Sequence, residues 1–312
     1  MIKKIEPCYP LNGTLTVPGD KSISHRALML GALIGNGMTI SNLATGADVQ
    51  STLNCLRTLG TEIEQSGTTV RIKKPFPVPA KNIDIELNAG NSGTTMRLLC
   101  GLLAGASIPV RIRGDDSLSR RPMKRITEPL SLMGAIIKSS NHKPPLTIVS
   151  GADRAVTYTS KVASAQVKSA ILLAGLGVEG RTIVREPNLS RDHTERMLDY
   201  LGVSIEKDAS NLLTKITGPV SLTTRNISIP GDSSSAAFWA AAALFTGGEL
   251  TIENVGCNPT RFGFFTILKR MGAAIERHNM RRVNNEPCCD LRVSAASLRG
   301  VDIRGSEIPG LI

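Results

Sequence analysis

Aromatic residues are scarce in this sequence, and long apolar runs are absent. Only 3% of the residues are Phe, Trp or Tyr, with a single Trp. Extensive stacking of nucleic-acid bases on aromatic rings is therefore excluded. No uninterrupted apolar run approaches the ~18 residues of a membrane-spanning helix, and residues 1–7 lack the apolar core of a signal peptide. We expect neither a nucleic-acid nor a membrane partner.

The cysteines and histidines form no recognisable metal or disulfide pattern. The six cysteines contain no CxxC pair, and the four histidines do not combine with them at zinc-ligand spacing. Cys55 and Cys100 lie in apolar, helix-like sequence and are predicted to be buried thiols. This usage fits the reducing cytoplasm, which is the localisation we expect, and predicts no metal site.

The net charge of +11 is spread along the chain. Continuous basic runs are only two residues long, for example at 73–74, 120–121 and 281–282. A nucleic-acid-binding arm usually concentrates its charge, whereas dispersed charge suits small anionic ligands or a solvated surface. A solvated surface accounts for most of these charges.

Four Ser- or Gly-rich turns recur at nearly even spacing. They occupy residues 18–26, 88–97, 163–169 and 230–235, and each opens an apolar run. Reference positions Ser22, Gly93, Ser164 and Ser234 are 71, 71 and 70 residues apart. A helix N-terminus offers free backbone N–H groups and a favourable dipole to anions. The repeat therefore predicts binding of phosphate or carboxylate groups.

A second marker supports the same period. Four helix-like stretches are each followed by a glycine, at positions 60, 134, 202 and 272. A short strand-like segment follows each of these glycines. Glycine is the residue that a helix end with positive φ requires. Further strand candidates are residues 70–72, 110–112, 146–149 and 250–252. The repeating element is thus a mixed α/β unit of about seventy residues.

The two Pro-Gly-Asp turns, at residues 18–20 and 230–232, are three repeats apart. This spacing predicts three units in a domain that spans 20–229. A fourth unit follows, and a fifth begins near residue 310. We therefore expect the chain to be a C-terminally truncated piece of a six-unit protein, with a second domain that is incomplete.

Six motifs together resemble one family. They are residues 11–26, 88–97, 114–123, 164–166, 190–195 and 230–237, and in this order they are similar to the signatures of 5-enolpyruvylshikimate-3-phosphate (EPSP) synthases. The resemblance covers essentially the whole chain. It implies the two-domain enolpyruvyl transferase fold, an inverse α/β barrel with three βαβαββ units per domain. It also implies that residues 1–19 pack with 230–312.

The resemblance also implies a reaction. Phosphoenolpyruvate donates its enolpyruvyl group to the 5-hydroxyl of shikimate 3-phosphate, and phosphate is released after addition and elimination. The reaction belongs to chorismate and aromatic amino-acid biosynthesis. It needs no metal or organic cofactor, and the enzyme is expected to be a monomer whose partners are its two substrates.

The candidate site residues lie in the repeated turns. Lys21 places a cation at a helix N-terminus, where it opposes the dipole, so an anionic partner is expected. By resemblance Lys21 is the catalytic candidate, which touches both substrates and assists proton transfer or offsets developing charge. The resemblance assigns shikimate 3-phosphate to Lys21, Ser22, Arg26, Ser164, Ala165, Gln166 and Arg191. It assigns phosphoenolpyruvate to Lys21, Gly93, Arg121 and Gln166.

Other interpretations of these residues are plainer. Ser22 and Ser164 also suit ordinary helix caps, and Lys21 could be a solvated lysine. A non-catalytic anion-binding fragment is one alternative function. A UDP-N-acetylglucosamine enolpyruvyl transferase is another, but the reactive Cys of that family is missing from residues 115–121.

The family's acid–base groups are not found in this sequence. An aspartate that follows the Glu-Ile-Pro segment and a later Lys-Glu-x-x-Arg cluster are expected beyond residues 307–309, and neither is present. Glu307 is not a convincing substitute. We therefore expect the isolated chain to bind shikimate 3-phosphate weakly and to turn over negligibly.

Overall fold

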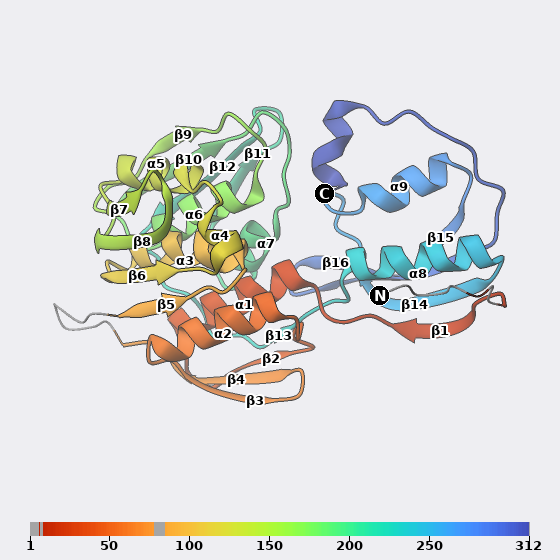
Figure 1. Cartoon of the computed structure of the whole chain (residues 1–312), viewed down its shortest axis with the longest axis horizontal. Coiled ribbons are helices and arrows are strands. Elements are labelled where there is room, and N and C mark those ends of the chain that lie inside the picture. Colours follow the sequence, from red (N-terminus) through yellow and green to blue (C-terminus); the bar gives the residue numbers. More distant parts are fainter. Residues whose placement is uncertain (1–5, 7–8, 78–84, 312) are drawn as a thin grey trace. The chain divides into compact units, whose positions relative to one another are not determined.

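The computed structural model describes residues 6, 9–77 and 85–311, and it divides the chain into two compact units. The larger unit is Lys21–Ile229, and the smaller joins Met1–Asp20 to Pro230–Ile312 (Figure 1). Each unit has its own apolar core. Within the described ranges, no helix combines the length and the apolar character needed to cross a membrane.

Three copies of one arrangement build the larger unit. In the second and third copies a helix links two parallel strands, whereas in the first copy the helix leads into a strand whose parallel neighbour comes from a later part of the chain. In each copy a second helix leads into an antiparallel hairpin (Figure 1). The first copy contains α1 (Lys21–Ile34), β2 (Met38–Ser41), α2 (Ala47–Thr58), β3 (Glu62–Ser66), β4 (Thr69–Lys74) and β13 (Ile227–Ser228). The second contains β5 (Glu86–Asn88), α3 (Gly93–Gly105), β6 (Val110–Arg113), α4 (Asp116–Ser119), α5 (Lys124–Leu132), β7 (Ile136–Ser140) and β8 (Lys143–Ser150). The third contains β9 (Thr157–Thr159), α6 (Ala165–Gly175), β10 (Gly180–Arg185), α7 (His193–Tyr200), β11 (Ile205–Asp208) and β12 (Leu213–Gly218).

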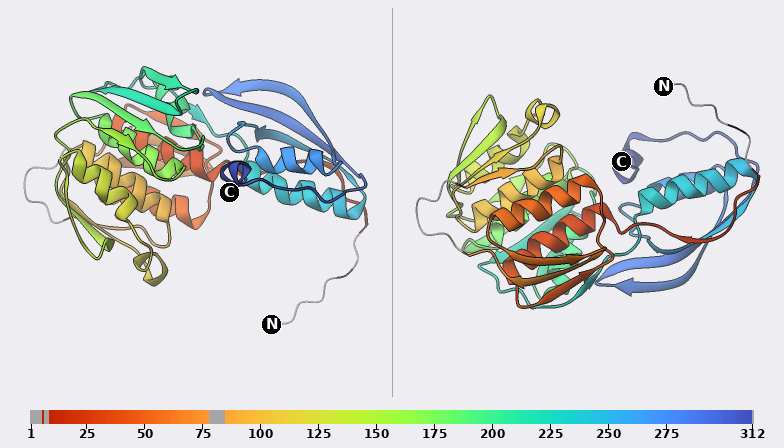
Figure 2. Two further views of the ribbon diagram at one scale, coloured as in Figure 1. Left: turned by 90° about the horizontal axis from the view of Figure 1, so that it is seen from above. Right: turned by 60° about the horizontal axis from the view of Figure 1, so that its bottom comes forward.

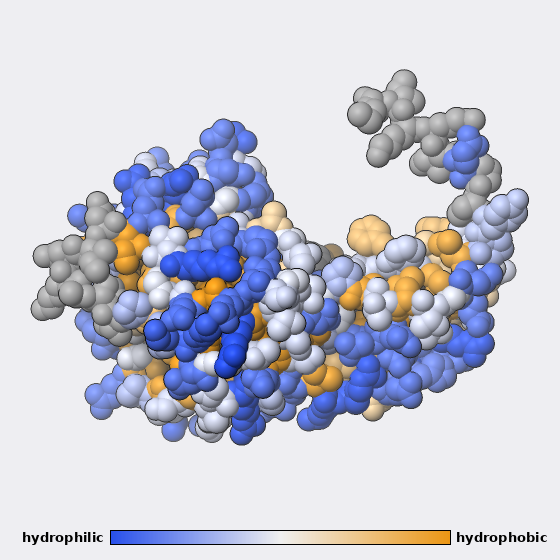
Figure 3. Space-filling view, turned by 90° about the horizontal axis from the view of Figure 1, so that it is seen from below, coloured by the Kyte–Doolittle hydropathy of each residue, from blue (hydrophilic) through white to orange (hydrophobic). Residues whose placement is uncertain are grey.

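The smaller unit contains the same arrangement. Its sheet has the order β1-β14-β16-β15, and helix α8 lies along one face of it (Figure 2). The elements are β1 (Asn12–Thr16), α8 (Ser233–Thr246), β14 (Glu249–Gly256), α9 (Gly263–Arg270), β15 (Ala274–Val283), β16 (Glu286–Ser294) and the 3-10 helix η1 (Gly305–Gly310). The outer side of α8 is apolar, with Phe238 and Phe245 80% and 82% exposed, and Figure 3 shows apolar surface on this unit.

Each unit takes one strand of a sheet from a distant part of the chain. β1 precedes α1 in the sequence but pairs in parallel with β14 of the smaller unit. Conversely, β13 precedes α8 but pairs in parallel with β2 of the larger unit. The predicted repeat is therefore present in the spatial arrangement of the strands. The first copy of the larger unit takes β13 from late in the chain, and the smaller unit takes β1 from the start of the chain.

The two Pro-Gly-Asp turns hydrogen-bond to each other. Asp20 donates its N–H to the Pro230 carbonyl, and Asp232 donates to the Pro18 carbonyl, both at 2.8 Å. Arg261 lies beside both carboxylates, with Nε 3.2 Å from Asp20 and Nη2 3.5 Å from Asp232. One buried guanidinium thus balances two acidic side chains where the chain segments cross.

Local sequence explains where the helices begin and end. Ser92 and Ser164 cap α3 and α6 by accepting N–H groups of Thr95 and Val167, at 3.1 and 3.5 Å. The predicted glycines all have positive φ: Gly60 (94°), Gly134 (93°), Gly202 (91°) and Gly272 (104°). Short strands follow each of them, as predicted.

Helices α3 and α6 pack through their backbones. A Cβ atom at Gly101 would lie 2.2 Å from the Ala170 carbonyl oxygen, and one at Gly105 would lie 2.5 Å from that of Ala174. Only glycine allows this approach. The contact holds the two helices in register, and so it also sets where their N-termini lie.

Candidate active site

The beginnings of α3 and α6 are joined by side chains. Gln166, in the first turn of α6, donates through Nε2 to Thr94 Oγ1 at 3.0 Å. Its Oε1 accepts from Arg97 Nη1 at 2.8 Å. Gln166 is thus held at both ends by groups on α3. The sequence prediction placed Gln166 at both substrates, and the structure brings it next to Gly93.

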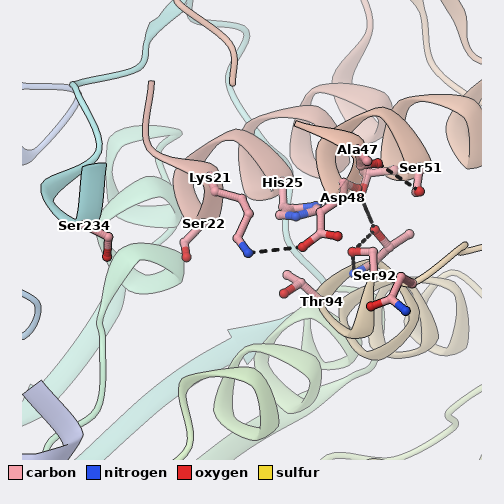
Figure 4. Close-up of polar contacts among 12 residues, drawn as sticks. Lys21, Ser22, His25, Ala47, Asp48, Ser51, Ser92, Thr94 and Ser234 are labelled. Atoms are coloured by element: carbon pink, nitrogen blue, oxygen red, sulfur yellow. Dashed lines mark hydrogen bonds and ion pairs between the residues drawn. The ribbon is translucent and has the colours of Figure 1, made fainter. Parts of the chain in front are cut away.

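Lys21 is the first residue of α1 and lies beside the start of α2 (Figure 4). Its Nζ is 3.1 Å from Asp48 Oδ2, and its side chain is 51% exposed. The backbone carbonyl of Asp48 accepts from Thr95 Oγ1 at 3.2 Å, which ties α2 to the first turn of α3. An ion pair this exposed is weak.

Buried hydroxyls connect the same helices below Lys21. His25 Nδ1 and Thr52 Oγ1 are 2.7 Å apart, and Thr52 Oγ1 is 2.7 Å from Thr95 Oγ1. Thr95 in turn donates to Ser92 Oγ at 2.7 Å. His25 is fully buried.

Arg26 is buried and links three helices. Its Nε donates to Thr194 Oγ1 of α7 at 2.6 Å, and its Nη2 donates to Ser169 Oγ of α6 at 2.8 Å. Nη1 donates to the Ser22 carbonyl at 2.8 Å. Its 3% exposure makes Arg26 primarily a connector of these helices, and its assignment to shikimate 3-phosphate stays a prediction.

Ser22 and Arg191 lie together. Arg191 Nη1 is 3.4 Å from Ser22 Oγ, and both residues are half-buried. A guanidinium next to a hydroxyl at a helix start suits a phosphate group, because charged donors make the stronger hydrogen bonds. Ser164 and Ala165 begin α6, and the Ser164 N–H donates to Glu186 Oε1 at 3.1 Å.

Two guanidinium groups lie against Gly93. A Cβ atom on Gly93 would be 2.8 Å from Arg97 Nη1 and 3.5 Å from Arg121 Nη1. Arg121 is oriented by Asn91 Oδ1, which accepts from its Nη2 at 2.9 Å. The pKa of Arg97 is lowered, first by burial and then by the positive charges of Arg121 and Arg125. Mutual repulsion of these cations would be relieved by an anion.

Substituting Gly93 by Ala should therefore disturb this group of cations. The new methyl would displace Arg97 from Gly93 and strain its bond to Gln166. We expect phosphoenolpyruvate binding in the presence of shikimate 3-phosphate to weaken about tenfold, the effect of losing one charged hydrogen bond. Calorimetric titration measures the change. Gly46→Ala is the control, since a Cβ there meets nothing within 4 Å, and equal affinities for both variants would contradict the prediction.

Sequence reasoning missed several residues at this site. Thr94 and Arg97 follow the predicted Gly93 on α3, and both bind Gln166. Asp48 carried no signal, because it opens the second helix of the copy, outside the repeated turns. All three are recognised only when the helices are placed side by side.

Comparisons with known proteins show which family this chain is similar to. A family model described as EPSP synthase (3-phosphoshikimate 1-carboxyvinyltransferase) matches residues 5–311. The chain is 47% identical over 309 residues to the 3-phosphoshikimate 1-carboxyvinyltransferase of Bacillus licheniformis, covering 97% of this chain and 71% of the relative. It is 48% identical to that of Geotalea uraniireducens, covering 99% and 72%. A solved EPSP synthase from Acinetobacter baumannii superposes with a TM-score of 0.87 at 40% identity, covering 97% of this chain and 70% of that one.

Proposed function

The chain belongs to the EPSP synthase family, and on that basis we propose that its larger unit binds shikimate 3-phosphate at the starts of α1, α6 and α7. The contact between Arg191 and Ser22 carries the proposal. It places a guanidinium, a hydroxyl and a helix N-terminus in one spot, and each of these favours a phosphate group. Ser164, Ala165 and Gln166 at the start of α6 would bind the same substrate.

Phosphoenolpyruvate would bind at the start of α3. Gly93 lets the backbone approach the ligand, while Arg121 and Arg97 supply positive charge. Gln166 contacts both Thr94 and Arg97, so it lies between the two proposed substrate sites. This placement supports its assignment to both substrates.

Lys21 is proposed as the catalytic group of the larger unit. In the family reaction the enolpyruvyl group passes to the 5-hydroxyl of shikimate 3-phosphate, and phosphate leaves. A half-exposed ammonium at the start of α1 can offset negative charge or carry a proton as the bonds change. Asp48 holds Lys21 through an exposed ion pair, which an anionic substrate can replace.

We further propose that the 312-residue polypeptide by itself binds shikimate 3-phosphate but turns over negligibly. Its sequence contains no aspartate after the Glu-Ile-Pro segment and no Lys-Glu-x-x-Arg cluster. General acid–base groups typically contribute about 10²–10⁴-fold each to a rate. The rate at which the purified chain releases phosphate from phosphoenolpyruvate in the presence of shikimate 3-phosphate tests this. A robust rate would contradict it.

Calorimetry with shikimate 3-phosphate tests the binding site. We expect the wild-type chain to bind this ligand and Arg191→Met to bind it about tenfold or more weakly, since a charged hydrogen bond is lost. The control is Arg181→Met, which removes an exposed arginine from the same copy. Equal affinity of Arg191→Met and wild type would exclude this phosphate site. Duplex DNA at two salt concentrations is the second titrant, and it should give no binding.

A further inference from the structure

Three ionised side chains are buried next to the proposed phosphate site. Lys168 Nζ of α6 is 2.8 Å from Glu186 Oε2 and 2.9 Å from Glu195 Oε1. The three side chains are 4%, 5% and 1% exposed, respectively. Glu186 follows strand β10, and Glu195 lies in the first turn of α7. This ion triad therefore joins three separate elements of the third copy.

Stability alone is a poor explanation for the triad. Burial disfavours the charge on Lys168, yet Glu195 and Glu186 outweigh it and hold the pKa of Lys168 above its ordinary value. Among the described residues, nothing donates a hydrogen bond to the buried Glu195 Oε2. Replacing buried ions by well-packed apolar groups of similar volume is often neutral or stabilising, so a gain in stability does not explain why these charges are retained.

The triad instead fixes groups at the proposed site. Glu186 uses one carboxylate oxygen for Lys168 and the other to accept the N–H of Ser164, the cap residue of α6, at 3.1 Å. Lys168 in turn donates its backbone N–H to the Ser164 carbonyl at 3.0 Å. Ser164 is therefore held from both sides by members of the triad.

The residues next to the triad in the sequence also join α6 to α7. Ser169 follows the triad lysine, and Thr194 precedes the glutamate of α7. Both hydroxyls accept from Arg26, at 2.8 and 2.6 Å, and they are 2.6 Å from each other. Fixing α6 against α7 thus also fixes the helix start that follows Arg191.

We propose that Lys168, Glu186 and Glu195 are positioning residues, which hold Ser164 and Arg191 in the geometry that binds the phosphate of shikimate 3-phosphate. They do not touch the substrate themselves. Directional ion pairs hold a helix start in one orientation, whereas apolar packing would let it shift, and displacements of about 1 Å can cost a hundredfold in function. The inference rests on the proposed function.

A fully neutral triad tests this without leaving an unpaired charge. The triple variant Lys168→Met/Glu186→Gln/Glu195→Gln should unfold within about 3 °C of the wild-type midpoint, a change of about 1 kcal/mol or less for a unit of this size. Its affinity for shikimate 3-phosphate should fall about tenfold or more. The control is Glu206→Gln/Lys215→Met, which removes an exposed ion pair of the third copy, with side chains 54% and 28% exposed. It should change neither quantity.

Amide hydrogen exchange at Ser164 provides a readout that does not depend on ligand. We expect faster exchange at Ser164 in the triple variant than in the wild type, while the core of α6 exchanges as before. Unchanged affinity or unchanged Ser164 exchange would overturn the inference, as would an affinity loss that only follows a large fall in the unfolding midpoint. If the wild type fails to bind shikimate 3-phosphate, the proposed function fails, and Ser164 exchange still decides whether the triad positions this residue.

Discussion

Replacing Gly101 by valine should destabilise the larger unit by about 3 kcal/mol or more, the upper range for an overpacked core. The first atom of the new side chain would lie 2.2 Å from the Ala170 carbonyl oxygen and 2.6 Å from its Cα. Backbone cannot move aside as a flexible side chain does, so α3 and α6 must separate. Because these two helices carry Gly93 and Gln166, substrate binding should be lost with stability.

Urea unfolding followed by circular dichroism measures this effect. Gly300→Val is the matched control, because a Cβ at Gly300 meets nothing within 4 Å and the residue has no positive φ. We expect its unfolding midpoint to stay close to the wild-type value. A Gly101→Val midpoint equal to that of the control would show that the α3 and α6 backbones do not touch at this position.

Removing only the cation of the buried triad should be far more harmful than neutralising all three groups. Lys168→Met leaves Glu186 and Glu195 buried with no ammonium between them. Breaking a buried ion pair by removing one partner typically costs about 3–5 kcal/mol. We therefore expect the single variant to lose more stability than the triple variant, although it carries fewer substitutions. Urea unfolding of both variants makes the comparison, and the opposite order would contradict it.

The pH dependence of the stability that Lys168 contributes follows from the direction in which its pKa is shifted. The pKa of Lys168 is raised from its ordinary value of 10.5, so its stabilising contribution is complete below that pH and is lost as the pH rises through the higher, folded-state value. The deficit of Lys168→Met relative to wild type should therefore be constant below pH 10.5 and shrink as the pH rises through the folded-state pKa of Lys168. Urea unfolding of both proteins across this range measures the change.

Much of the fold is predictable from the sequence because its signals are local. Ser92 and Ser164 cap their own helices, and the glycines at 60, 134, 202 and 272 end theirs, so each mark acts within a few residues. Buried Cys55 and Cys100 follow from their apolar surroundings in the same way. The repeat of about seventy residues is visible for the same reason.

The site depends on contacts that spacing along the chain does not reveal. Arg26 bonds to Thr194, 168 positions away, and Gln166 bonds to Thr94, 72 positions away. Nothing in the sequence indicated that Glu186 and Glu195 would both face Lys168. Such pairings exist only after the copies have packed against one another.

The pairing of β2 with the much later strand β13 has a consequence for synthesis on the ribosome. Ile40 of β2 pairs with Ile227 of β13, so the first sheet is completed only after the third copy has been made. At 5–20 residues per second, roughly 10 to 40 s separate the emergence of the two strands. Throughout that interval β2 is an open sheet edge, which can pair with other nascent chains. Slow translation or scarce chaperones should therefore reduce the yield of this protein more than that of an α/β protein whose sheets close in sequence order.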